Sequence, residues 1–70
     1  MILLDFLTKY RTCFHAGKTT NMSLQVVDCD KSKIILVDDM RIDWRRNPEI
    51  YHRIVRGWTI ACDTVIVFVE

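Results

Sequence analysis

The sequence predicts a small, mainly β domain with a short helix near its N-terminus. Apolar and polar residues alternate over several short segments, which is the period of a half-buried strand. Two runs, Ile34–Val37 and Val65–Val69, are rich in the β-branched residues that favour strands. The chain has 70 residues, of which 50% are hydrophobic and 27% charged, so it suits one folded domain and not a disordered segment.

The N-terminal segment is predicted to begin with a helix over about residues 1–8, because apolar residues recur at helical spacing from Leu3 to Leu7. Residues 10–15 alternate apolar and polar side chains, and we interpret them as a half-buried strand that ends in a turn at Gly17. Continuation of the helix to a cap at Gly17 is the competing interpretation, and both fit the pattern.

The middle of the chain is predicted to contain two strands joined by a polar turn. Met22–Val27 alternates and forms the first strand, and the turn Asp28–Ser32 has side chains that can accept hydrogen bonds from nearby backbone amides. Ile34–Val37 is apolar on both faces, which indicates a central strand that can extend to Ile42. Residues 43–48 form the long connection that follows.

Residues 48–57 fit two structures. Pro48 and Glu49 are typical of a helix start and Gly57 of a helix stop, so the whole segment can be helical and the fold then becomes α+β. The same residues also alternate as a strand, with Tyr51 and Val55 on one face. Local propensity slightly favours the helix, and tertiary context often overrides it.

The C-terminal segment predicts two strands, Trp58–Cys62 and Val65–Val69, with a turn at Asp63-Thr64. Both faces of the last strand are hydrophobic. Such a strand is either central in the sheet or lies at an edge, where a partner covers its backbone and side chains. We hypothesise the second arrangement, with a partner-binding edge composed of Val65, Ile66, Val67, Phe68, Val69, Ile60 and Trp58.

The charge is concentrated in one segment, although the net charge of the chain is only +1. Five of the six arginines lie between residues 41 and 56, and Trp44 and Trp58 bracket most of them. Arginines beside aromatic rings can contact nucleic-acid phosphates and bases, which makes RNA binding an alternative function. The near-zero net charge makes it the weaker alternative. The candidate RNA contacts are Arg45, Arg46, Arg53 and Arg56.

Two motifs imitate ligand sites but fail at a defining position. Gly17-Lys18-Thr19 looks like the end of a phosphate-binding loop, but Thr12 stands where that loop needs its first glycine. The acidic turn after residue 28 copies the first ligands of a calcium loop, but Lys33 stands at the obligatory glycine.

The cysteines and histidines predict neither a metal site nor catalysis. Three cysteines without a secretory signal indicate reduced thiols, and Cys13 with His15 is the only close Cys–His pair. His52 has no nucleophile at a diagnostic spacing. We therefore expect no enzyme activity, no cofactor and no metal.

The longest apolar run is Val65–Val69, which is far short of a membrane span. The apolar start of the sequence lacks the small-residue cleavage site of a signal peptide, so we expect no signal peptide.

Several motif positions follow a spacing found in a family of small barrels. They are Tyr10, Thr12, Phe14, Gly17, Leu24, Asp28, Ile34–Asp38 and Ile60–Ile66. In this order they resemble the two motifs of the Sm/LSm-like proteins. The resemblance implies a single Sm-like domain over residues 1–70, folded as a five-stranded barrel with a short N-terminal helix.

The departures from that pattern are also informative. The Met-Asn pair that reads RNA in the family is absent from the turn Asp28–Lys33, and Ala61-Cys62 replaces its Arg-Gly pair. Phe14-His15, Asp28-Cys29-Asp30 and the segment Cys62–Ile66 are similar to the Gemin-seven family, a divergent branch of Sm-like proteins in the survival-of-motor-neuron (SMN) complex.

This resemblance implies a non-enzymatic scaffold subunit in the cytoplasm and nucleus. Its partner would be another Sm-like protein, of the Gemin-six type, bound through edge strands. Further contacts would involve a helical subunit of the Gemin-eight type, other SMN-complex subunits and Sm proteins. The assembly would support loading of Sm proteins onto spliceosomal small nuclear RNAs, with RNA contacted only indirectly by this chain.

Overall fold

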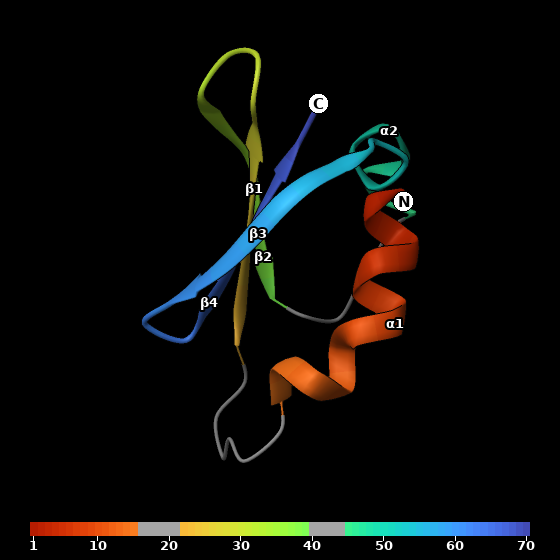
Figure 1. Ribbon diagram of the computed structural model, residues 1–70. Helices are drawn as coiled ribbons and strands as arrows, with labels where there is room; N and C mark the ends of the chain where they lie inside the picture. The colour runs from red at the N-terminus through yellow and green to blue at the C-terminus, as the bar shows by residue number, and fades with distance from the viewer. Residues whose placement is uncertain (16–21, 40–44) are drawn as a thin grey trace.

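The structure, a computed structural model, describes residues 1–15, 22–39 and 45–70, and the side chains of residues 11–15 and 39 lie outside this description. The described residues form two helices and four strands, so the expectation of a mainly β fold with an N-terminal helix is confirmed (Figure 1). The elements are α1 (Leu3–His15), β1 (Ser23–Asp28), β2 (Lys33–Asp39), α2 (Pro48–Tyr51), β3 (Val55–Ala61) and β4 (Thr64–Val69).

The strands form one mixed sheet in the order β2-β1-β4-β3. The hairpins β1–β2 and β3–β4 are antiparallel, and the two hairpins join through parallel pairing of β1 with β4. Leu24 of β1 lies opposite Val65 of β4 in this central pair. The five-stranded barrel is not shown, because the described residues form an open sheet whose edges are β2 and β3.

The predicted strand over residues 10–15 is wrong, because α1 continues through His15. Extending an existing helix adds about one hydrogen bond per ordered residue, whereas a new strand needs a neighbour to pair with. The Phe6 and Tyr10 rings lie on one side of the helix with their centroids 5.2 Å apart, as four-residue helical spacing requires. The predicted turn at Gly17, and its alternative role as a helix cap, lie outside the described residues.

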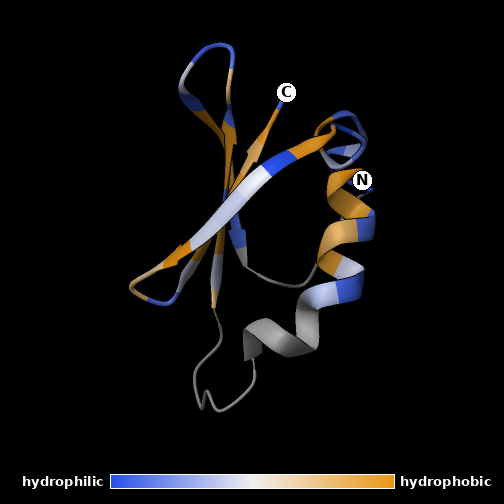
Figure 2. Ribbon diagram, viewed as in Figure 1, coloured by the Kyte–Doolittle hydropathy of each residue, from blue (hydrophilic) through white to orange (hydrophobic). Residues whose placement is uncertain are grey.

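The core lies between α1 and one face of the sheet (Figure 1). Figure 2 shows hydrophobic residues along the first turns of α1, on the side from which the helix packs against the sheet. Alternate residues of β1 and β4 face the helix and are buried, which confirms the predicted alternation of β1. The buried hydrophobic residues are Leu3, Phe6, Leu7, Met22, Leu24, Val26, Tyr51, Val65, Val67 and Val69.

Two strand positions differ from the prediction. Ile34–Val37 was expected at the centre, but β2 is an edge strand, with Ile34 50% and Val37 65% exposed. It ends at Asp39, and its predicted extension to Ile42 falls largely outside the described residues. Val65–Val69 was hypothesised to be an edge, but β4 is central and pairs with both β1 and β3. Both runs are apolar on two faces, so pattern alone did not distinguish them.

Residues 48–57 divide between the two predicted structures. α2 occupies only Pro48–Tyr51, and β3 begins at Val55, so the α+β alternative with the whole segment helical is wrong. The β3–β4 turn lies at Cys62-Asp63, one residue before its predicted place, and both residues have positive φ angles, of 48° and 61°. Such turns match the twist of antiparallel hairpins.

Among the described residues, neither helix combines the length and apolar content that a membrane crossing requires.

Candidate functional site

The outer edge of β3 is covered at its start and open in its second half. The Val55 amide donates to the Met1 carbonyl at 2.9 Å, and the Leu3 amide donates to the Arg53 carbonyl at 2.9 Å. The N-terminal residues thus occupy the edge next to residues 53–55. No described strand pairs with the outer edge of Gly57–Ala61, which we call the open β3 edge.

The side chains of the open β3 edge differ between the two faces of the sheet. Trp58 and Ile60 lie opposite Val67 and Val65, and therefore on the face that α1 covers. They remain 49% and 44% exposed. The Trp58 ring contacts Phe6 of α1, with centroids 6.0 Å apart, so the indole is held against the helix.

On the opposite face, the open β3 edge carries only small side chains, from Gly57, Thr59 and Ala61. A Cβ atom added at Gly57 would meet nothing within 4 Å, so another backbone can approach closely there. Charged residues and prolines are the usual means by which proteins prevent pairing at an edge, and residues 57–61 have neither.

The hypothesised partner-binding residues separate into two groups. Trp58 and Ile60 lie on β3, which is an edge strand of the described sheet. Val65, Val67 and Val69 are fully buried under α1 and are not available to a partner. Ile66 and Phe68 face the other side of the sheet, where they are partly exposed beside Val27 of β1. The five residues of Val65–Val69 therefore form the centre of the sheet and not its contact edge.

The sheet face opposite α1 carries no described helix (Figure 1). At the β2 edge of this face, Ile34 and Val37 are the most exposed of the large apolar residues in the described strands. Sequence reasoning missed them as a surface because it placed their strand at the centre of the sheet. The available signal was the charged residue at each end of the apolar run, Lys33 and Asp38, which is typical of an edge strand.

The four candidate RNA-binding arginines do not form one available cationic surface. Arg53 Nη1 donates to Asp28 Oδ2 at 2.7 Å, and Arg56 Nη1 lies 3.0 Å from Glu70 Oε2. Arg45 and Arg46 are exposed in the turn before α2. Arg53 and Arg56 are thus each engaged with a carboxylate of the same chain.

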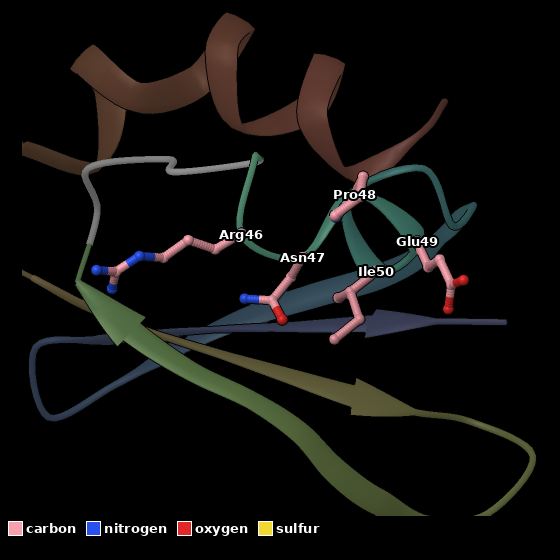
Figure 3. Close-up of a pocket in the computed structure, with 5 residues that line it drawn as sticks. All are labelled: Arg46, Asn47, Pro48, Glu49 and Ile50. Carbon is pink, nitrogen blue, oxygen red and sulfur yellow. The ribbon is translucent and has the colours of Figure 1, made fainter.

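A shallow pocket of about 240 Å³ lies beside Arg46 at the start of α2 (Figure 3). It is lined by Arg46, Asn47, Pro48, Glu49 and Ile50. Figure 3 shows the Arg46 and Glu49 side chains pointing in opposite directions, so the charged groups do not converge on a common ligand position. This arrangement lacks the convergent polar groups typical of a small-molecule site.

Asp28 is the buried charged residue of the described core, with 3% exposure. Its Oδ1 atom accepts the amides of Asp30 and Lys31 at 2.9 and 3.2 Å, and its Oδ2 atom accepts the Arg53 guanidinium. The Arg53 hydrogen bond holds the pKa of Asp28 below its usual value, desolvation opposes that shift, and the two amides add to it. Asp28 thus ties the β1–β2 turn to the segment before β3.

Metal-binding and thiol groups do not gather in the described part of the chain. No group of three His, Cys, Asp or Glu side chains there could hold a metal ion. Cys29 and Cys62 are free and exposed, in the turns of separate hairpins. The His52 Nδ1 atom donates to the Pro48 carbonyl at 2.6 Å, within the end of α2.

Comparisons of the chain with protein families, with curated proteins and with solved structures find no match.

Proposed function

We propose that this chain is a non-enzymatic protein-interaction module that binds another protein through the open β3 edge. The observation that carries the proposal is the pair Trp58 and Ile60, two half-exposed hydrophobic residues on the same face of β3, an edge strand whose inner side pairs with β4. Strand addition would supply hydrogen-bond partners along the outer edge of residues 57–61 and cover both side chains at once.

The energetics favour these two residues as the centre of the contact. Covering the exposed half of Trp58 or Ile60 contributes on the order of 1 kcal/mol each from apolar area alone. Trp58 is also held in place by Phe6 before binding, so little side-chain entropy is lost when a partner covers it.

The shape of the edge defines the partner. An added strand must present apolar side chains at alternate positions on the α1 face, where they meet Trp58 and Ile60. On the other face, Gly57, Thr59 and Ala61 leave room for larger side chains. The expected partner is therefore a protein with an exposed, extended segment of alternating large apolar residues, bound as a fifth strand.

A narrower version of the proposal comes from the sequence resemblance. In it, the partner is an Sm-like protein of the Gemin-six type, and the chain acts as a scaffold in the SMN complex during assembly of spliceosomal small nuclear ribonucleoproteins. This version rests on short motifs, with Trp58 and Ile60 as its remaining edge contacts. It predicts that an Sm-like protein is the strand donor.

The test compares two isoleucines with nearly equal exposure. Ile60 is 44% and Ile54 is 46% exposed, but only Ile60 lies on the open β3 edge. A photo-crosslinking residue at Thr59, used in cells that express the chain, captures the partner for identification by mass spectrometry. Ile60→Lys is expected to weaken binding of that partner at least tenfold, whereas Ile54→Lys leaves it within a factor of about two.

The variants are first compared by circular dichroism and thermal unfolding, so that a folding defect is not mistaken for lost contact. Unchanged partner binding by Ile60→Lys would overturn the proposal. Capture of an Sm-like protein supports the narrower version, and a partner without that fold removes it. Salt-sensitive binding of oligo-U by the wild-type chain, lost in Arg45→Ala and unaffected by Ile60→Lys, would favour the RNA-binding alternative.

A further inference from the structure

The second edge of the sheet, β2, carries a pattern that is complementary to itself. It begins with Lys33, continues through four apolar residues, Ile34–Val37, and ends with Asp38 and Asp39. No described strand pairs with its outer edge. We infer that β2 pairs in antiparallel orientation with β2 of a second copy of this chain. This inference concerns the opposite edge from the proposed partner site and is independent of it.

The pairing of β2 with β1 shows which face each β2 residue occupies, because directly opposite residues in a sheet share a face. Asp38 lies opposite Leu24, and Lys33 lies opposite Asp28, so both charged residues are on the α1 face. Ile34 and Val37 are on the other face, opposite Val27 and Gln25 respectively.

A bulge at the middle of β2 changes the alternation. The register shifts between Val26 and Val27, so Ile35 is the extra residue on β2. Ile35 and Leu36 both pack against the core, and therefore both belong to the α1 face. Lys33, Ile35, Leu36 and Asp38 thus lie on the α1 face, and Ile34 and Val37 lie on the opposite face. Along the strand, the order is α1 face, opposite face, α1 face, α1 face, opposite face, α1 face. This order reads the same in both directions.

That symmetry selects a single register for self-pairing. In a continuous sheet, Lys33 lies opposite Asp38 of the second copy, Ile34 opposite its Val37, and Ile35 opposite its Leu36. If the register shifted by one or two residues in either direction, a residue on the α1 face of one copy would lie opposite a residue on the other face of the second copy. The bulge, which interrupts the ladder with β1, is therefore compatible with the same bulge in a second copy.

Charge and burial select the antiparallel orientation. Each end of the paired strands brings a lysine opposite an aspartate, twice by symmetry, whereas parallel pairing would place like charges together. The Asp38 carboxylate has two oxygens, so it can accept from the second copy's Lys33 while it keeps an interaction in its own chain. Ile34 and Val37, now 50% and 65% exposed, would cover each other across the interface.

The product is a symmetric dimer with one continuous eight-stranded sheet. The two-fold axis is perpendicular to the sheet, so both α1 helices lie on the same face. The two open β3 edges lie at the far ends and stay accessible. One strand pair is a small interface, and we expect dissociation constants in the micromolar range, on the order of 10–100 µM.

Sedimentation equilibrium of the full chain tests the inference. Val37→Lys is expected to give a monomer, because a lysine on an edge strand opposes pairing and Val37 is too exposed to matter for folding. Lys33→Asp and Asp38→Lys should each weaken the dimer at least tenfold, and the double variant Lys33→Asp/Asp38→Lys should restore it. Lys31→Asp makes the same charge change in the turn and should have no such effect, nor should Ile60→Lys.

A crosslinking experiment tests the register directly. In a chain whose three cysteines are replaced by serine, a mixture of Ile34→Cys and Val37→Cys variants should form a disulfide-linked dimer, whereas either variant alone should not. A wild-type chain that stays monomeric at about 500 µM, well above the expected dissociation constant, would overturn the inference. So would association that Ile60→Lys abolishes and Val37→Lys leaves intact, or a charge-swapped double variant that fails to dimerise.

Discussion

β2 and β4 contain similar runs of aliphatic residues and have opposite structural roles. Each run is apolar on both faces, but β4 is paired on both sides, whereas β2 is paired only with β1 among the described strands. Val67 of β4 is fully buried and Val37 of β2 is 65% exposed. The comparison teaches that strand composition reports how much apolar surface must be covered. It does not report whether the same chain or another one covers it.

The largest expected difference between these strands is in stability. Val67→Ala should lower the free energy of unfolding by about 2–3 kcal/mol, because it leaves a cavity in the core. Val37→Ala should change it by no more than about 0.5 kcal/mol in the monomer, because its side chain is mostly in water. Urea unfolding at low protein concentration measures both. Equal losses in the two variants would contradict the assignment of centre and edge.

A smaller effect is expected at Asp28, where β1 meets the β1–β2 turn. The pKa of Asp28 is lowered in the folded state, so its charged form stabilises the fold at pH values above the ordinary pKa of 3.8. That contribution is lost as the pH falls through the folded pKa. The melting temperature of the wild type should therefore fall more steeply below about pH 4 than that of Asp28→Asn.

Asp30→Asn is the matched control for this pH dependence, because Asp30 is an exposed neighbour in the same turn. Its profile should follow that of the wild type. If Asp28→Asn and the wild type lose stability in parallel over this range, the Arg53–Asp28 bond does not contribute as described.

The smallest effect is expected at the ion pair near the start of β3. The Arg56 and Glu70 side chains are 63% and 42% exposed, so their attraction is weakened by water and salt. Arg56→Ala should change the free energy of unfolding by less than about 0.5 kcal/mol, whereas Arg53→Ala leaves the buried Asp28 carboxylate without its cation and should cost clearly more. Paired urea titrations distinguish the two, and equal costs would contradict this ranking.

Local patterns predicted many of the elements. Alternation predicted β1, and two strand-like runs around a turn signal predicted the β3–β4 hairpin. The acidic turn after β1 has the predicted hydrogen bonds, which come from the amides of Asp30 and Lys31. Trp58 and Ile60 were predicted as part of a partner-binding edge; they lie on an edge strand of the described sheet, and their contact with a partner stays a prediction. The strand over residues 10–15 failed because its pattern fits both a helix and a strand, and the upstream helix extended through it.

What the sequence by itself determined is which side chains must leave water and which neighbours share a face of a helix or strand. Those properties depend on spacing within a few residues. Only the tertiary structure decided that β1 pairs in parallel with β4, because that contact joins segments about 40 residues apart and depends on how the whole chain packs. This single pairing moved Val65–Val69 to the centre and left Ile34–Val37 and the second half of β3 at the edges of the described sheet, where the two proposed contacts would form.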